Sequence, residues 1–158
     1  MAASATRKLG HVVLNVSSLA RSVPCYESVL GISEVARLGE AERKIVGAEM
    51  VFFSFGDNHH DLGLREAPTG TGVAAEGLGL AHVAFKIGDG LAQLQSHAAR
   101  LRALGIEFSF TRNHIVSQSI YVKDPDGILV EMYVDADPEI WRNDPRKKGA
   151  PYECTCHF

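Results

Sequence analysis

The feature that most constrains the fold is a repeat within the 158-residue chain. The matching segments are LGHVVLNVSSLARSVPCYESVLGI, residues 9–32, and LAHVAFKIGDGLAQLQSHAARLRALGI, residues 80–106. Each opens with Leu, a small residue, His and Val, and each ends on Leu-Gly-Ile. The two histidines, His11 and His82, stand 71 positions apart. Self-similarity of this kind indicates two copies of one supersecondary unit.

Each copy has the pattern of a strand, a helix and three further strands. The apolar run around the histidine leads into an amphipathic segment, and Gly31 and Gly105 stand where a left-handed residue ends a helix. The predicted later strands are GISEVAR, KIVGAEMVFFSF and HHDLGL in the first copy, and IEFSF, SQSIYVKD and ILVEMYV in the second. These alternating elements predict an α+β fold.

The repeat also predicts the layout of the chain as a single domain with two modules. We expect a first module at about residues 7–66 and a second at about 79–135. The segment between them, 67–78, is rich in Gly, Ala, Pro and Thr and has the composition of a linker. Residues 136–158 form a C-terminal tail.

Composition and charge exclude several classes of function. The formal net charge of −3 offers no basic field for nucleic acid or for an anionic membrane surface. No apolar run approaches the roughly 20 residues of a membrane-spanning helix, and the start, MAASATRKLG, lacks the apolar core of a signal peptide. An odd number of cysteines, three, favours a reducing compartment over a disulfide framework. We therefore expect a cytoplasmic protein without nucleic-acid or membrane partners.

Individual cysteines and aromatic residues yield only modest expectations. Cys25 falls in a helical pattern and is expected to be buried. Cys154 and Cys156 stand beside His157, but two thiols in a terminal tail are a weak basis for a metal site. Trp141 is expected in a short C-terminal helix.

The stretch NHHDLGL places two adjacent histidines at the start of an apolar, strand-like run. Neighbours in a strand point to opposite faces, so we expect His59 and His60 on opposite faces. Counted from Gly56 and Gly127, the turn glycines before the last strand of each copy, His60 falls on Glu131.

A pseudo-twofold axis between the copies would set His11 against His82 and His60 against Glu131. Four metal-capable side chains would then converge from otherwise apolar strands. Each of them alone is explained as a hydrogen-bonded core residue, but their coincidence in register favours a metal site.

The repeated opening HVVLNV…SLARSV…YESVLGI and the closing YVKDPDGILVEMY resemble the vicinal oxygen chelate superfamily. Its members include glyoxalase I, fosfomycin-resistance transferases, bleomycin-binding proteins and extradiol dioxygenases. The resemblance covers about residues 9–134. It implies two βαβββ modules in a pseudo-twofold arrangement, which form a curved mixed sheet around a metal cleft. It also implies a homodimer.

Carried over position by position, the resemblance implies the metal ligands His11, His82 and Glu131. Two histidines and one carboxylate leave coordination positions open, which suits iron(II), although manganese(II) accepts the same set. The glyoxalase pattern has a glutamate where this chain has His60, and this difference argues against a glyoxalase.

Two further stretches resemble the small single-domain catechol 2,3-dioxygenase-like proteins. HHDLGL is similar to the element that supplies a second-sphere histidine, here His60. In NHIVSQSIYVKDPDG, His114 stands seven residues before Tyr121, and Tyr121 stands ten before Glu131. The larger extradiol enzymes place the corresponding histidine nearer position 112, which is Arg112 here. The loop between the modules is also longer than usual.

The resemblance implies an iron(II)-dependent extradiol dioxygenase that cleaves a catechol or related aromatic diol with O2, as in aromatic degradation. His60 would move protons near neutral pH. Tyr121 would donate a hydrogen bond to the substrate, and His114 would help to hold it. A packed strand aromatic remains an alternative for Tyr121, and a solvated loop residue for His114. Asp61 is expected to orient a neighbouring group or to cap a strand end.

Other functions of the same scaffold stay open. A thiol transferase of the fosfomycin-resistance type would share the ligand set, would favour manganese and would need a cationic subsite, for which Lys86 and Arg112 are nearest in sequence. A different lyase or isomerase of the superfamily is a further alternative, and so is a non-catalytic binding protein, which would usually lack the triad. The DPDG turn at 124–127 needs no catalytic role, and His97 is expected to be exposed.

Overall fold

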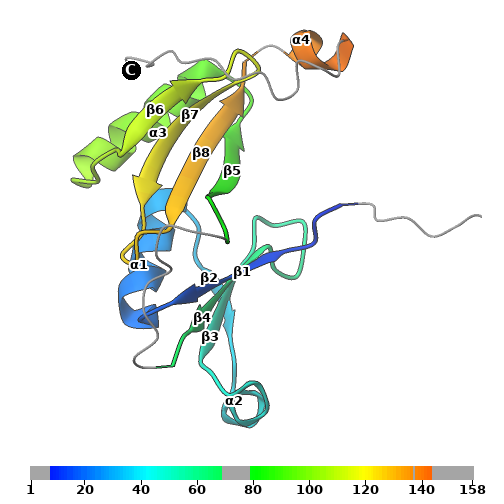
Figure 1. Ribbon diagram of the computed structural model, residues 1–158, viewed down its shortest axis with the longest axis vertical. Coiled ribbons are helices and arrows are strands. Elements are labelled where there is room, and N and C mark those ends of the chain that lie inside the picture. The colour runs from blue at the N-terminus through cyan, green and yellow to red at the C-terminus, as the bar shows by residue number, and fades with distance from the viewer. Residues whose placement is uncertain (1–7, 69–78, 137, 144–158) are drawn as a thin grey trace, which may run out of the picture. The chain divides into compact units, whose positions relative to one another are not determined.

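The computed structural model describes residues 8–68, 79–136 and 138–143 (Figure 1). Its elements, in chain order, are β1 (Val12–Val16), α1 (Leu19–Leu30), β2 (Glu34–Arg37), α2 (Glu40–Val46), β3 (Met50–Phe53), β4 (Leu62–Glu66), β5 (Val83–Gly88), α3 (Leu91–Ala103), β6 (Phe110–Asn113), β7 (Ser117–Lys123), β8 (Leu129–Asp135) and α4 (Pro138–Asn143).

The strands form two four-stranded mixed sheets with the same topology. The order is β1-β4-β3-β2 in the first sheet and β5-β8-β7-β6 in the second. In each sheet the opening strand runs parallel to the last strand of its copy, and the other neighbours are antiparallel. The prediction of an α+β fold built from a repeated unit is confirmed.

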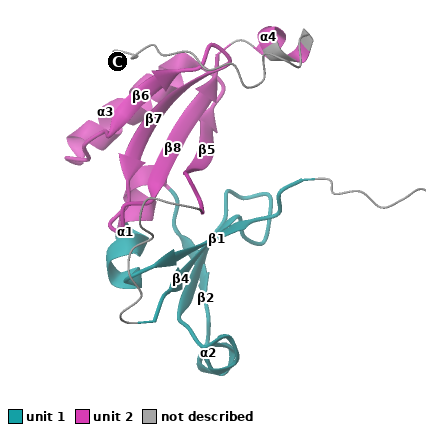
Figure 2. Cartoon of the chain, viewed as in Figure 1, with its two compact units in different colours: residues 1–24, 32–71 teal, residues 25–31, 72–158 magenta. Residues whose placement is uncertain are grey.

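Two compact units make up the chain (Figure 2). The first comprises residues 1–24 and 32–71, and the second comprises residues 25–31 and 72–158. The second half of α1 therefore belongs with the second sheet. In that half the Tyr26 hydroxyl donates a hydrogen bond to Asp124 over 3.2 Å.

An arginine of α3 also holds this half of α1. The Arg100 guanidinium donates to the carbonyl oxygens of Ser28 and Val29, at 2.6 and 2.9 Å. It satisfies carbonyl groups that the end of a helix leaves without partners. Gly31 then adopts a φ of 71°, and Gly105 after α3 has a φ of 72°. The two predicted glycine helix ends are confirmed.

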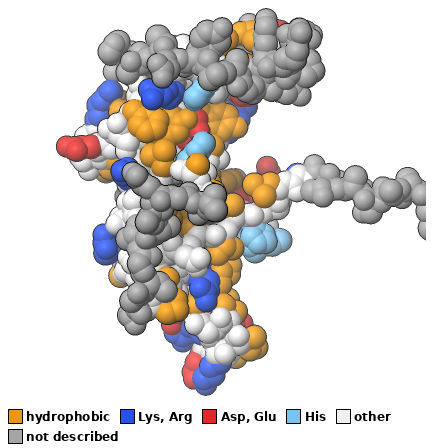
Figure 3. Space-filling model, in the orientation of Figure 1, with side chains coloured by type: hydrophobic (Ala, Val, Ile, Leu, Met, Phe, Trp, Pro, Cys, Tyr) orange, Lys and Arg blue, Asp and Glu red, His pale blue; other side chains and the backbone are white. Residues whose placement is uncertain are grey.

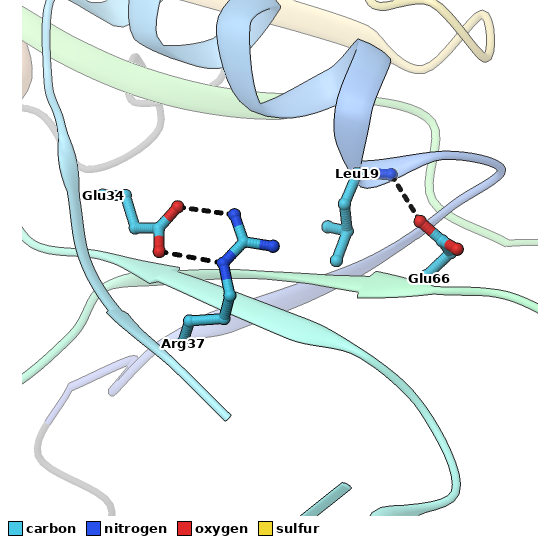
Figure 4. A network of polar contacts seen from close by, with 4 residues as sticks. All are labelled: Leu19, Glu34, Arg37 and Glu66. Carbon is cyan, nitrogen blue, oxygen red and sulfur yellow. Dashed lines mark hydrogen bonds and ion pairs between the residues drawn. The ribbon is translucent and has the colours of Figure 1, made fainter. Parts of the chain in front are cut away.

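The first sheet buries one apolar row, formed by Leu14, Val16, Val51, Phe53, Leu62 and Leu64. At its edge, Glu66 accepts a hydrogen bond of 2.7 Å from the backbone N–H of Leu19 (Figure 4). A carboxylate at this position satisfies a free N–H at the start of α1 and complements the helix dipole. Figure 4 also shows Glu34 and Arg37 of β2 joined by two hydrogen bonds, of 3.1 and 2.7 Å.

The predicted strand KIVGAEMVFFSF is wrong over its first three residues. Lys44, Ile45 and Val46 end helix α2 instead, and the strand begins only at Met50. The helix carries acidic residues in its first turn, basic ones in its last, and a left-handed Gly47 after its end. This distribution matches the helix dipole and a glycine C-cap. Ile45 and Val46, before Gly47, are β-branched residues, which are common in strands, and this similarity led to the wrong prediction.

The second sheet has two chemically different faces. Helix α3 contacts β5, β7 and β8, and the sheet's fully apolar row, Ile120, Val122, Val130, Met132 and Val134, is buried. The alternate positions bring Phe110, Arg112, Ser119, Tyr121, Glu131 and Tyr133 onto the other face. We call this second face the site face.

No helix among the described residues is long and apolar enough to cross a membrane.

Candidate active site

A histidine and a buried carboxylate meet on the site face of the second sheet. His82 directly precedes β5, and Glu131 lies in β8, which pairs with β5. The His82 Nε2 atom is 3.0 Å from Glu131 Oε2. The other carboxylate oxygen accepts a hydrogen bond from the Ser119 hydroxyl at 2.5 Å. Only 7% of Glu131 is exposed, so these partners fix the orientation of a carboxylate that has little water around it.

Tyr121 lies beside this pair. It is the register partner of Glu131 across β7 and β8, and its ring centroid is 5.9 Å from that of His82. Burial raises the pKa of the Tyr121 phenol, and its hydrogen bond with the Glu131 carboxylate and the charge of that group raise it further. The phenol therefore stays protonated at neutral pH and remains a hydrogen-bond donor.

His114 reaches the same tyrosine from the β6–β7 turn. Its Nε2 atom lies 3.2 Å from the Tyr121 hydroxyl. The turn is held by a bond from the His114 N–H to the Ser117 carbonyl at 2.8 Å and by the Asn113 side chain, which accepts from the Ile115 N–H at 2.9 Å. Ile115 has a φ of 66°, an unfavourable conformation for a β-branched residue. The spacing of His114 and Tyr121 in the sequence therefore corresponds to a contact.

Ser119 and Phe110 did not figure in the sequence-based prediction of the site, and Arg112 was given a role there only as a cation near the subsite of the alternative transferase. Ser119 orients Glu131. The Phe110 ring stacks on Tyr121, with centroids 4.3 Å apart and planes at 25°, and Arg112 lies over Phe110, with Cζ 4.8 Å from the centroid. Figure 3 shows histidine and carboxylate side chains set among hydrophobic ones on this part of the second unit. The alternation of polar residues in SQSIYVKD is the pattern that could have revealed Ser119.

The first unit brings His11 and His60 together. Their ring centroids are 4.4 Å apart, and the Phe52 ring lies 4.9 Å from His60. The expectation that His59 and His60 occupy opposite faces of a strand is wrong. Both precede β4, which begins at Leu62, and their Nδ1 atoms are 2.6 Å apart. Burial lowers the pKa of His60, as do the neighbouring His59 and His11, whereas Asp61 raises it.

The Asp61 side chain stabilises the turn that precedes β4. Its carboxylate accepts hydrogen bonds from the Phe55 N–H at 2.7 Å and from the Asn58 side chain at 2.5 Å. These bonds, the first of them above all, lower the pKa of the Asp61 carboxyl. Because the side chain ties both ends of the turn, the chain does not extend until the next residue, and both histidines stay in the loop.

The ungapped count that matched His60 to Glu131 does not agree with the sheet register. Val12 pairs with Leu62 in the first sheet, and Val83 pairs with Val130 in the second. By this register Gly63, three residues after His60, is the counterpart of Glu131. The contacts are nevertheless similar in kind, because His60 packs on His11 and Phe52, while Glu131 contacts His82 and Tyr121.

The donor groups suit a divalent transition metal. Imidazole nitrogen and carboxylate oxygen are ligands for iron and manganese, and the His82–Glu131 pair already presents one of each, with the carboxylate oriented by Ser119. Within residues 8–68, 79–136 and 138–143, no group of three or more His, Cys, Asp or Glu side chains is gathered as a metal site. His11 lies in the first unit, so the three-residue ligand set stays a prediction.

Comparison with known proteins identifies the family. The family model described as the Glyoxalase/Bleomycin resistance protein/Dioxygenase superfamily matches residues 8–132. The chain belongs to this superfamily. Solved structures agree with the fold: a superfamily domain from Frankia sp. EAN1pec is 22% identical with a TM-score of 0.67, covering 83% of this chain and 99% of that one. The manganese-bound fosfomycin resistance protein FosX of Listeria monocytogenes is 21% identical with a TM-score of 0.64, covering 89% and 100%.

Curated relatives in the superfamily bear dioxygenase names. The chain is 31% identical to biphenyl-2,3-diol 1,2-dioxygenase 2 of Rhodococcus globerulus, over 94% of this chain and 76% of the relative. It is 33% identical to biphenyl-2,3-diol 1,2-dioxygenase 3 of the same organism, over 85% and 67%. It is 28% identical to catechol-2,3-dioxygenase of Bacillus subtilis, of which it covers 44%. The superfamily is thus shared with relatives that are named for action on aromatic diols.

The remaining sequence-based expectations have mixed outcomes. His97 is half-buried rather than exposed, because it packs beside Arg100 near the end of α1. Cys25 is also only half-buried. The expected C-terminal helix is present as α4. The cluster of Cys154, Cys156 and His157 and most of the expected linker lie outside the described residues.

Proposed function

We propose that the protein is an iron(II)-dependent extradiol dioxygenase that cleaves a catechol or related aromatic diol. The observation that carries the proposal is the connected group on the site face, in which His114 contacts the Tyr121 hydroxyl and Glu131 lies between Tyr121 and His82. Relatives that are named as diol dioxygenases, at 31% and 33% identity, support the same reaction class.

The proposed metal ligands are His11, His82 and Glu131. Bound there, iron(II) would supply Lewis acidity toward the diol oxygens and a redox-active centre for dioxygen, with manganese(II) as the alternative ion. The overall reaction breaks one ring carbon–carbon bond beside the diol and places both atoms of O2 in the product. It needs no external reductant.

The chain's own residues have separate proposed tasks. His60 holds and returns a proton during the reaction, because an imidazole can do both near neutral pH. Tyr121 donates a hydrogen bond to a substrate oxygen from a phenol that stays protonated. His114 fixes the direction of that phenol and helps to retain the diol. Phe110 and Tyr121 stack on each other, so they offer their ring edges to the face of the substrate ring.

Oxygen uptake tests the proposal directly. The full chain is loaded anaerobically with iron(II) and mixed with catechol, 3-methylcatechol or 2,3-dihydroxybiphenyl. We expect O2 consumption coupled to a yellow ring-opened product, with kcat reduced about a hundredfold or more in His60→Phe. His97→Gln, a histidine replacement outside the site, should retain the wild-type kcat.

The same preparation distinguishes the alternative. A fully metallated protein that consumes no O2 with any diol would contradict the dioxygenase reaction. Manganese-dependent addition of a thiol to an epoxide would then identify a thiol transferase of the fosfomycin-resistance type. A chain that binds neither metal would contradict the ligand set itself.

A further inference from the structure

Arg112 occupies an unusual place on the site face. It lies in β6 and covers the Phe110 ring, which in turn stacks on Tyr121. The guanidinium is therefore joined through two aromatic rings to the group that contains Glu131. A guanidinium held over a ring face by its charge can still donate hydrogen bonds from its N–H groups to a ligand.

The charge of Arg112 is not balanced as the charge of Lys86 is, a cation at the opposite edge of the same sheet. Lys86 of β5 forms ion pairs with Asp89 at 2.7 Å and with Asp135 at 2.9 Å. Across the described part of the chain, no ion pair involves Arg112, and its cationic group contacts an aromatic face instead. A half-buried guanidinium without a carboxylate partner favours an anion that arrives with a ligand.

We infer that Arg112 selects aromatic diols that carry a carboxylate side chain. The inference rests on the proposed function and names its substrate class. The ring of such a substrate packs against the edges of the stacked Phe110 and Tyr121 rings. Its diol points toward Glu131, and its carboxylate accepts two hydrogen bonds from the guanidinium. Strands β6 and β8 are two spacings apart, about 9–10 Å, and Arg112 stands two residues along β6 from the row that contains Glu131. The arginine side chain already lies back over Phe110 in that row, and together with an acetate side chain it spans this separation.

A carboxylate on an aromatic ring fits better than a small phosphonate. The phosphonate would meet the cation but would bring no aromatic ring to the edges of the stacked Phe110 and Tyr121 rings. An arylacetate uses both, because its planar carboxylate matches the guanidinium fork and its ring packs against the edges of the two aromatic rings.

The test compares an acid with its uncharged ester. The substrates are 3,4-dihydroxyphenylacetate and its methyl ester, and the quantity is the ratio of their kcat/KM values in the iron-loaded full chain. We expect the wild type to prefer the acid and the ratio to fall about tenfold to a hundredfold in Arg112→Gln. Arg112→Lys should fall between them, because a lysine keeps the charge but loses the fork.

A matched control comes from α3. Arg102 lies over the Phe108 ring, with Cζ 4.9 Å from the centroid, so Arg102→Gln removes a similar stacked arginine outside the site face. Its acid-to-ester ratio should equal that of the wild type. A second measurement needs no turnover: titration calorimetry of phenylacetate and of propylphosphonate with the full chain, with and without iron(II).

The outcomes separate this inference from the proposed function. Diol cleavage with an unchanged acid-to-ester ratio in Arg112→Gln overturns the inference and leaves the dioxygenase in place. Equal losses on both substrates also overturn it, because Arg112 would then serve only the Phe110 ring. Tighter binding of propylphosphonate than of phenylacetate overturns the choice of a carboxylate. Arg112-dependent binding of phenylacetate without any diol cleavage supports the anion site and removes the proposed reaction.

Discussion

Glu131 lies within 3.0 Å of His82 while its second oxygen accepts a hydrogen bond from Ser119. A carboxylate that is 7% exposed is thus held at both oxygens, one of them by a proposed metal ligand. The carboxylate is oriented before any ligand binds.

Removal of the Ser119 hydroxyl should weaken metal binding without removing a ligand. In Ser119→Ala the Glu131 carboxylate loses the bond that fixes its orientation, and second-sphere losses of this kind cost about tenfold to a hundredfold in metal affinity. Competition with a chelator for iron(II) or manganese(II) measures the effect. Ser117→Ala, in the same strand, is the control, and equal affinities in the two variants would refute the role of Ser119.

The Tyr121 hydroxyl should contribute more to the rate of diol cleavage than the Tyr121 ring does. Tyr121→Phe keeps the stacking on Phe110 but removes the hydroxyl that donates to Glu131 and contacts His114. We expect kcat for diol cleavage to fall about tenfold to a hundredfold, the value of one hydrogen bond to a charged group. Tyr133→Phe, on the same face, should behave as wild type in the oxygen-uptake assay. Similar rates in both variants would leave Tyr121 as a packing residue only.

The buried pair of Tyr26 and Asp124 should stabilise the attachment of α1 to the second unit. Tyr26 is 1% exposed and donates to a carboxylate that also accepts from the N–H groups of Asp126 and Ile128. Tyr26→Phe should lower the free energy of unfolding by about 1–2 kcal/mol. Urea titration measures this change, with the half-buried Tyr133→Phe as control. An unchanged midpoint would mean that water replaces the lost donor.

His97 should make stability depend on pH. Burial lowers the pKa of its imidazole below the ordinary 6.5, and Arg100 lowers it further, while the Val29 carbonyl raises it. As the pH falls through 6.5, His97 becomes protonated in the unfolded chain while it is still neutral in the folded chain. The contribution of neutral His97 to the free energy of unfolding is therefore fully present above pH 6.5. It is lost as the pH falls toward the lower pKa of the folded chain.

His97→Gln carries no proton to take up at that position, so its free energy of unfolding should decrease less between pH 7.5 and pH 5 than that of the wild type. Urea titrations at the two pH values measure the difference. Parallel decreases in the two proteins would show that other groups cause the acid sensitivity.

Much of the fold could be predicted because its helices and strands follow from local sequence patterns that occur in both copies of the repeat. Alternating apolar residues, glycines at helix ends and a period shared by His11 and His82 each depend on a few neighbouring residues. The strand over residues 44–46 and the strand position of His59 and His60 were predicted wrongly for the same reason. In both places a competing local rule decided the structure: the charges and C-cap of α2, and the Asp61 turn.

The sequence by itself determined the repeated units, the strands that carry Tyr121 and Glu131, and the spacing that brings His114 to Tyr121, because strand alternation and hairpin register translate sequence distance directly into contact. Only the tertiary structure decided that Arg112 lies over Phe110 on the face that contains Glu131, that Gly63 rather than His60 is the register counterpart of Glu131, and that half of α1 joins the second unit. These facts depend on which strands pair, in which register, and on buried bonds such as that between Tyr26 and Asp124. Tyr26 and Asp124 are nearly a hundred positions apart, and no local pattern links them.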